Sequence, residues 1–200
     1  MTVIRAYFNE RADIWDETVA EKDTAKLERM ATRLNLKPGF KILDVGTGTG
    51  VFLPFIFGKI GQDGQVIAID IADEMLLKAK VKGLPGNIDY LCADVMEIPV
   101  VGEVFDAVVC YSSFPHFQDK PKAFAEMLRV IKPGGSLMIC HTSSRAHINE
   151  IHSQIPDVRH DILPAGDDMQ LLLSAAGFSD IAIEDDSDSY LARASKPQMV

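Results

Sequence analysis

The sequence predicts a doubly wound α/β domain, in which helices cover both faces of a mostly parallel β-sheet. Runs rich in Val, Ile, Leu, Phe and Cys alternate along the chain with helix-like segments, which is the order expected of such a sheet. Each run is almost continuously apolar, as strands buried on both faces are. With 47% hydrophobic residues in a chain of 200, a single domain has enough apolar side chains for a full core.

The segment before the first strand is expected to be helical. Its apolar side chains recur at helical spacing and include Tyr7, Phe8, Trp15, Leu27 and Met30. Two interpretations of Trp15 remain open: it closes over a ligand, or it belongs to an ordinary amphipathic helix that packs on the sheet. We expect one domain over 1–200, made of a helical cap (1–36), a ligand-binding core (37–141) and a terminal part (142–200).

The core is expected to contain five parallel strands with helices between them. The predicted strands are 40–45, 65–70, 88–92, 104–110 and 135–141. The predicted helices are 50–60, 72–82 and 119–131. Asp119 is the expected cap of the last helix, and Pro121 lies in its first turn. Pro133-Gly134-Gly135 is expected to form a turn that ends this helix and leads into the fifth strand.

After residue 141 the pattern changes. We expect a helix over 143–155, irregular chain over 156–166, and a helix over 167–176 that ends at Gly177. Two further strands are predicted at 178–184 and 190–195, and the acidic residues between them indicate a solvent-exposed hairpin turn.

Composition limits the function. The formal net charge of −9 argues against nucleic acid as a partner, because binding to phosphates requires a positive surface. The three cysteines, Cys92, Cys110 and Cys140, have no metal-binding spacing and form no disulfide framework, which suits a cytoplasmic protein. No signal peptide and no membrane-inserting stretch is expected. The expected partner is a small molecule, and a homodimer is the expected assembly.

The most informative motif follows the first predicted strand. Residues 42–50 read Ile-Leu-Asp-Val-Gly-Thr-Gly-Thr-Gly. Such a loop brings bare backbone and the start of a helix against a ligand, because glycine allows close approach and left-handed torsions. The dinucleotide-binding motif requires a glycine at the sixth position counted from Gly46, and this chain has Val51 there. The order Asp-x-Gly-x-Gly-x-Gly therefore argues against a nicotinamide-dependent oxidoreductase.

With this loop, the chain resembles the class I S-adenosylmethionine-dependent methyltransferases, in particular the small-molecule enzymes of ubiquinone and menaquinone biosynthesis. The resemblance extends over residues 5–141 and includes later motifs at 66–70, 92–95, 105–117 and 128–135. It implies a Rossmann-like methyltransferase fold with seven strands, the last one antiparallel, and S-adenosylmethionine as the cofactor. It assigns cofactor contacts to Asp44, Gly46, Thr47, Gly48, Gly50, Asp70, Ile71, Met75, Asp94, Val95, Cys110, Tyr111, Ser112, Tyr7 and Trp15.

The roles of these residues follow their places at strand ends. Ligands of open α/β sheets bind beyond the carboxyl ends of the strands, where the glycine loop, Asp70 and Asp94 are all expected. The Asp70 carboxylate can accept hydrogen bonds from both ribose hydroxyls, and Ile71 and Met75 can pack on adenine. The resemblance assigns Asp94 and the Val95 backbone to the adenine edge. It also brings residues 110–112 near the methionine part and the methyl group.

The histidines are the best indication of what lies beyond the cofactor. Four of the five, His141, His147, His152 and His160, lie close together in sequence. Three interpretations remain open. In the first, the histidines are surface or capping residues. In the second, one histidine is a general base, and His116 and His141 are the better placed for this role. In the third, His141, His147 and His152 bind a transition metal. His147 and His152 are five residues apart, not the three or four that align two ligands on a helix.

The sequence thus predicts an enzyme that transfers a methyl group from S-adenosylmethionine to a small-molecule acceptor. Two alternatives remain: a protein that binds S-adenosylmethionine without transferring the methyl group, and a metal-binding methyltransferase that uses the histidines of 141–160.

Overall fold

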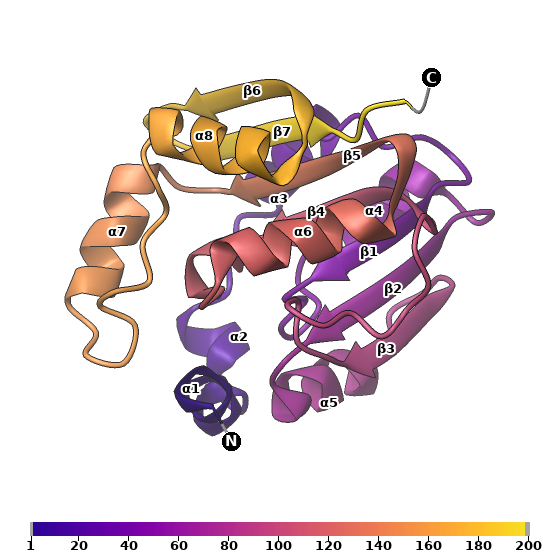
Figure 1. Ribbon diagram of the computed structural model, residues 1–200. Helices are drawn as coiled ribbons and strands as arrows, with labels where there is room; N and C mark the ends of the chain where they lie inside the picture. Colours follow the sequence, from indigo (N-terminus) through magenta and orange to yellow (C-terminus); the bar gives the residue numbers. More distant parts are fainter. Residues whose placement is uncertain (1, 199–200) are drawn as a thin grey trace.

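The computed structural model describes residues 2–198 and contains a seven-stranded sheet of order β3-β2-β1-β4-β5-β7-β6 (Figure 1). The strands are β1 (Lys41–Val45), β2 (Gln65–Asp70), β3 (Ile88–Cys92), β4 (Phe105–Tyr111), β5 (Ile131–His141), β6 (Ser179–Asp185) and β7 (Tyr190–Ser195). Strands β1 to β5 are parallel, whereas β7 lies between β5 and β6 and is antiparallel to both. The expected fold class, including the antiparallel last strand, is confirmed.

Helices cover both faces of this sheet. They are α1 (Val3–Arg11), α2 (Trp15–Thr18), α3 (Thr24–Arg33), α4 (Leu53–Ile60), α5 (Asp73–Val81), α6 (Lys120–Val130), α7 (Arg145–Ser153) and α8 (Gly166–Ala176), with a 3₁₀ turn, η1 (Phe114–His116). One buried core includes Phe124 of α6 and Leu173 of α8. The other includes Leu27 of α3 and Ile56 of α4. The strands are apolar on both faces because each face packs against one of these cores.

Short-range signals explain where several helices begin and end. The side chain of Asp119 accepts a hydrogen bond from the Lys122 amide at 3.0 Å, so the predicted cap of α6 is confirmed. Asp23 caps α3 in the same way, through the amides of Ala25 and Lys26. Helix α8 ends at Gly177, whose φ of 99° is the left-handed conformation that glycine adopts readily.

The predicted turn at Pro133-Gly134-Gly135 is wrong. Helix α6 continues directly into β5, which begins at Ile131, earlier than the predicted residue 135. Ile131 pairs with Phe105 and Ser136 pairs with Ala107, so the residues between them form a bulge in β5. The amide of Gly134 donates to the Lys196 carbonyl at 2.9 Å, and this contact with the chain after β7 holds the bulge within the sheet. Sequence-local turn signals could not reveal this pairing.

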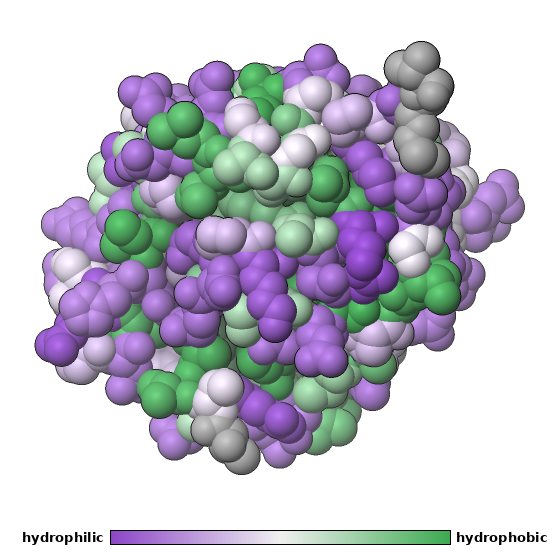
Figure 2. All heavy atoms as spheres, in the orientation of Figure 1, coloured by the Kyte–Doolittle hydropathy of each residue, from purple (hydrophilic) through white to green (hydrophobic). Residues whose placement is uncertain are grey.

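The segments that surround the carboxyl ends of β1, β2 and β4 come from distant parts of the chain. Figure 1 shows α1 and α2 near these ends and α7 farther along the same side of the molecule. The predicted helix over 50–60 begins only at Leu53, which leaves residues 46–52 as a loop at this edge. In Figure 2, apolar side chains gather over the region of α8, where Leu171 is 68% exposed. No helix within residues 2–198 has the length and apolarity needed to cross a membrane.

Candidate functional site

The glycine loop after β1 lies against the end of β4. The amides of Gly46 and Thr47 both donate to the Ile69 carbonyl, at 2.8 and 3.0 Å. Gly46 has a φ of 70°, and a Cβ at this position would lie 2.3 Å from the Cβ of Ser113. Ser113 cannot easily move away, because its hydroxyl donates to the Val45 carbonyl at 2.6 Å. Glycine at position 46 is therefore required both by the backbone torsion and by the close approach of β4.

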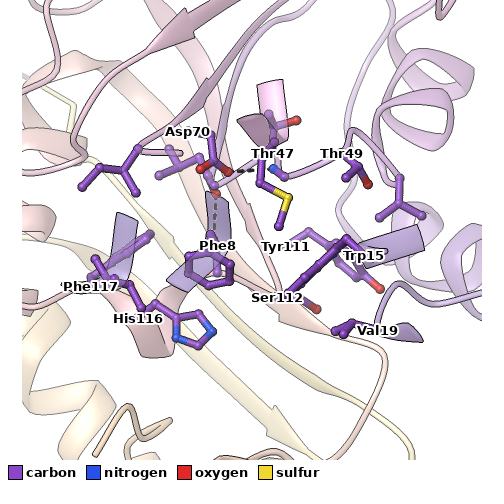
Figure 3. A pocket seen from close by; sticks show the side chains of 18 of the residues that line it. Phe8, Trp15, Val19, Thr47, Thr49, Asp70, Tyr111, Ser112, His116 and Phe117 are labelled. Atoms are coloured by element: carbon purple, nitrogen blue, oxygen red, sulfur yellow. Dashed lines mark hydrogen bonds between the residues drawn. The ribbon is translucent and has the colours of Figure 1, made fainter. Parts of the chain in front are cut away.

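Asp70, at the end of β2, is held next to this loop by backbone hydrogen bonds. Its Oδ2 accepts from the Gly48 amide and its Oδ1 accepts from the Ala72 amide, both at 2.8 Å. Burial raises the pKa of Asp70 to about 6. Each carboxylate oxygen has a second lone pair, so Asp70 can still accept two hydrogen bonds from a ligand. Figure 3 shows its side chain beside Thr47 at the cavity.

Two more polar groups near the loop have no protein partner. Among the described residues, Oδ1 of Asp44 and Oγ1 of Thr47 are buried without a hydrogen bond. Burial raises the pKa of Asp44 to about 7. Buried polar atoms normally have a partner, and Thr47 lines the cavity, so its hydroxyl is the one that a ligand can reach. A hydroxyl or ammonium group of the ligand would satisfy it.

A cavity of about 560 Å³ extends from this loop, a size typical of small-molecule sites. Figure 3 shows Asp70 and Thr47 on one side, His116 and Phe117 on another, Phe8 between them, and Trp15 at the right of the view near Val19. The cavity therefore combines a polar region at the strand ends with an aromatic region formed by the cap and η1. The predicted site residues that line it are Gly46, Thr47, Gly48, Asp70, Ile71, Met75, Asp94, Val95, Tyr111, Ser112, Trp15, His116, His141 and His152.

Some predicted cofactor residues do not line the cavity. Asp44 lies behind the loop at 2% exposure, and Gly50 faces the side chains of Leu53, Leu84 and Ala79. Cys110 is fully buried in the core. Tyr7 packs with Ile4 and Val158 instead of facing the cavity, and its neighbour Phe8 lines the cavity. Helical periodicity identified the cap but could not distinguish these two adjacent aromatic residues.

The cap is joined to the loop by a polar contact at Asp16 of α2. Oδ1 of Asp16 accepts from the Thr49 hydroxyl at 2.5 Å, and its Oδ2 lies 2.6 Å from the Lys82 ammonium. Lys82 also donates to the Thr49 carbonyl at 2.7 Å. These contacts hold Trp15, the single tryptophan of the chain, over the cavity.

We expect Asp16→Ala to loosen this cap. The lost contacts are partly exposed, so the cap should become less stable by about 1 kcal/mol. This loss corresponds to roughly fivefold faster amide exchange in α1 and α2. Hydrogen exchange followed by mass spectrometry measures this, and Trp15 fluorescence reports the change locally. Asp13→Ala is the matched control, because Asp13 pairs with Lys78 but is 84% exposed. Equal exchange in both variants would show that Asp16 does not hold the cap.

Three histidines lie on the side of the cavity away from Asp70. The rings of His116 and His152 are 4.8 Å apart, and both residues line the cavity together with His141. Burial, together with the nearby His116 and His152, lowers the pKa of His141 to about 3. All three imidazoles therefore belong to one part of the site; the sequence named each of them as a candidate but did not group His116 with His152.

The predicted metal site of His141, His147 and His152 is wrong. His147 is exposed on α7 and does not line the cavity that the other two share. Within residues 2–198, no group of three or more His, Cys, Asp or Glu side chains is arranged to hold a metal ion. The spacing of five residues between His147 and His152 explains this, because it directs the two side chains to different sides of the helix.

Sequence reasoning missed several residues of the site. Thr142 and Ile151 line the cavity although no motif marked them. Asp161, in the irregular segment between α7 and α8, was also missed. Its Oδ2 lies 2.8 Å from Nδ1 of His116. No local signal could have identified Asp161, because its partner is far away in sequence.

Comparison with known proteins agrees with this geometry. The methyltransferase domain family matches residues 43–139. The ubiquinone/menaquinone biosynthesis C-methyltransferase UbiE of Idiomarina loihiensis is 34% identical over 123 residues, which are 58% of this chain and 49% of that protein. The same enzyme of Shewanella piezotolerans is 37% identical over 115 residues, 56% of this chain and 46% of that protein. The chain thus spans about half the length of these curated relatives.

Solved structures share the fold. An S-adenosylmethionine-dependent methyltransferase from Aquifex aeolicus has a TM-score of 0.74 at 24% identity, with 96% of this chain and 98% of that chain covered. The phosphoethanolamine N-methyltransferase 2 of Haemonchus contortus, in complex with S-adenosyl-L-methionine, has a TM-score of 0.75 at 20% identity, with 98% and 58% covered. The comparisons thus agree: residues 43–139 match the methyltransferase domain family, about half of the chain resembles UbiE, and the fold is that of S-adenosylmethionine-dependent methyltransferases.

Proposed function

We propose that this protein transfers a methyl group from S-adenosylmethionine to a small-molecule acceptor. The observation that carries the proposal is the single cavity that joins the glycine loop and Asp70 to a cluster of histidines and aromatic side chains. One side has the polar groups that a nucleoside with an amino-acid tail requires. The other side has imidazoles that can act on an acceptor.

The described residues fit the cofactor. Asp70 has two free acceptor positions for the ribose hydroxyls, and Ile71 and Met75 line the cavity where they can pack on adenine. The unpartnered hydroxyl of Thr47 lines the cavity at the loop, where the polar methionine part would extend. When bound, S-adenosylmethionine supplies a methyl group on a sulfonium, whose leaving group is a neutral thioether that needs no acid.

The acceptor side favours a small molecule with an apolar body and a polar reacting group. Phe8, Phe117 and Ile148 supply apolar contacts, and His116 and His141 are the candidate general bases. Alignment of acceptor and methyl group supplies most of the catalysis, on the order of 7–11 kcal/mol in favourable cases. The relatives are named for C-methylation in quinone biosynthesis, so an aromatic ring of the quinone type that carries a hydroxyl group is the first acceptor to test.

The test is direct. The purified protein is incubated with S-adenosylmethionine and each candidate acceptor, and the S-adenosylhomocysteine formed is quantified against a reaction without acceptor. Formation of product with an aromatic or other small acceptor supports the proposal. Tight binding of the cofactor without product from any acceptor would instead indicate a binding protein that does not transfer the methyl group.

Cofactor binding should weaken as the pH falls. Asp70 can accept from both ribose hydroxyls only when it is ionised, and burial raises its pKa to about 6. We therefore expect the Kd for S-adenosylmethionine to rise as the pH is lowered from 8 to 5, which calorimetry or Trp15 fluorescence measures. Asp70→Asn should flatten the part of the curve near pH 6, and an unchanged curve in this variant would contradict the assignment.

We also propose a cytoplasmic location, which the three free cysteines support. The homodimer stays a prediction that size-exclusion chromatography with light scattering can test.

A further inference from the structure

The contact between His116 and Asp161 joins two segments that lie far apart in sequence. His116 ends η1, just after β4, and Asp161 lies between α7 and α8. Nδ1 of His116 is 2.8 Å from Oδ2 of Asp161, and their side chains are only 13% and 14% exposed. A buried polar contact of this length between irregular segments requires the fold to place both partners accurately.

This contact determines which nitrogen of His116 carries the proton. A carboxylate can only accept, so the Nδ1 that faces Asp161 must be the donor. In a neutral imidazole the other nitrogen, Nε2, is then a hydrogen-bond acceptor. His116 lines the cavity, so this acceptor belongs to a side chain that an incoming molecule can touch.

The surroundings of His116 keep its ring in place. The ring of Phe8 meets it edge to face at 5.0 Å, and the ring of His152 lies 4.8 Å away. His152 is itself held by the same segment, since its Nδ1 is 2.5 Å from the Asp161 carbonyl oxygen. Asp161 thus contacts both histidines, one through its side chain and one through its backbone.

The charged and titratable groups around His116 are Asp161, His152, Lys120 and His141. Burial lowers the pKa of His116, the bond to Asp161 opposes this, and His152 and Lys120 lower it again. The ammonium of Lys120 is held by the carbonyls of Pro115 and Phe117, at 3.0 and 3.1 Å. The net effect is a neutral imidazole at physiological pH, which can accept a proton.

We propose that Asp161 is the positioning residue for His116 as a base, and that the acceptor is a molecule whose nucleophilic oxygen, nitrogen or sulfur atom carries a proton. This inference rests on the proposed methyl transfer. In the step, the nucleophile forms a bond to the methyl carbon and the bond from sulfur to that carbon breaks. Its electron pair stays on sulfur to give a neutral thioether, and Nε2 of His116 takes the proton.

His141 is the weaker candidate for this role. Among the described residues its Nε2 is buried without a hydrogen-bond partner, so no partner at that nitrogen orients the ring. Its pKa of about 3 also makes it a poor base near neutral pH. Both histidines line the cavity, but His116 also has a carboxylate partner that orients its ring.

The first experiment uses the protein bound to S-adenosylhomocysteine and needs no acceptor. Long-range ¹H–¹⁵N NMR of histidine-labelled protein reports the tautomer and the pKa of His116. We expect the Nδ1–H tautomer in the wild type and a pKa lower by about one unit in Asp161→Asn, because a carboxylate charge is lost. Asp157→Asn is the matched control: Asp157 follows the same helix, pairs with Arg11 and does not line the cavity. The Nε2–H tautomer, or equal pKa values in wild type and Asp161→Asn, would overturn the proposal.

The second experiment measures methylation of probe compounds. Hydroquinone, catechol and 2-mercaptoethanol have a proton on the nucleophilic atom, whereas pyridine and dimethyl sulfide have none. We expect S-adenosylhomocysteine with the first group only, and a rate that rises with pH around the pKa measured for His116. Asp161→Asn should lower kcat at pH 7 by about 10- to 100-fold and leave the cofactor Kd unchanged, and Asp157→Asn should match the wild type.

The two possible failures can be told apart. Methylation with an unchanged kcat in Asp161→Asn, or equal methylation of the proton-free compounds, would overturn the role of the His116–Asp161 pair and leave the methyl transfer standing. Failure of S-adenosylmethionine and S-adenosylhomocysteine to bind the folded wild type would contradict the proposed function itself.

Discussion

Gly46→Ala should be the most damaging single substitution in the cofactor loop. The new Cβ would lie 2.3 Å from the Cβ of Ser113, and the residue would keep a φ of 70°. The left-handed torsion costs roughly 1–2 kcal/mol, and overpacking adds roughly 1–3 kcal/mol. The free energy of unfolding should therefore fall by roughly 2–5 kcal/mol. For a chain of this size, each kcal/mol lost lowers the Tm by about 2–4 °C. Chemical denaturation and calorimetry measure both quantities.

The same substitution should also remove most of the cofactor affinity, because relief of the clash moves the loop away from Asp70. Gly39→Ala is the matched control: Gly39 has a φ of 79°, but a Cβ there meets nothing within 4 Å. It should show the torsional cost alone and bind the cofactor normally. If both variants lost the same stability and kept equal affinity, the close approach of Ser113 to the loop would have no energetic importance.

Asp70→Ala should weaken S-adenosylmethionine binding by roughly 1.5–3 kcal/mol, because a charge-assisted acceptor for the ribose is lost. This corresponds to about a 10- to 150-fold rise in Kd, which isothermal titration calorimetry measures. The Gly48 and Ala72 amides also lose their acceptor, so the loop should become less ordered.

Asp89→Ala provides the comparison for this variant. Asp89 lies on the neighbouring strand β3, is exposed, and accepts a hydrogen bond only from Gln65. It removes one carboxylate without touching the cavity, so cofactor affinity should be unchanged. A Kd in Asp70→Ala that equals that of Asp89→Ala would show that the cofactor does not bind at the end of β2.

The order of strands and helices could be predicted because each depends on nearby residues. Continuous apolar runs marked β1 to β5, and the acidic turn between two further runs marked the hairpin of β6 and β7. The start of β5 could not be predicted. Its first residues pair with Phe105 and with the chain after β7, and these contacts outweigh the local preference of Pro133 and Gly134 for a turn.

The polar side of the candidate site was also largely predictable. Parallel strands bring their carboxyl ends to one edge, so the motif residues Gly46, Asp70 and Asp94 had to lie near one another. The aromatic side of the site was less predictable, because two adjacent residues such as Tyr7 and Phe8 share the same helical pattern. Only packing against Val158 decides that Tyr7 is buried away from the cavity and Phe8 faces it.

By itself, the sequence determined the fold class, the glycine loop and the acids at the strand ends, since these follow from local periodicity and from the geometry of any parallel sheet. Only the tertiary structure decided which histidines share the cavity and that Asp161 holds His116. That contact depends on how η1 and the segment between α7 and α8 come together in three dimensions, and no pattern of neighbouring residues encodes it.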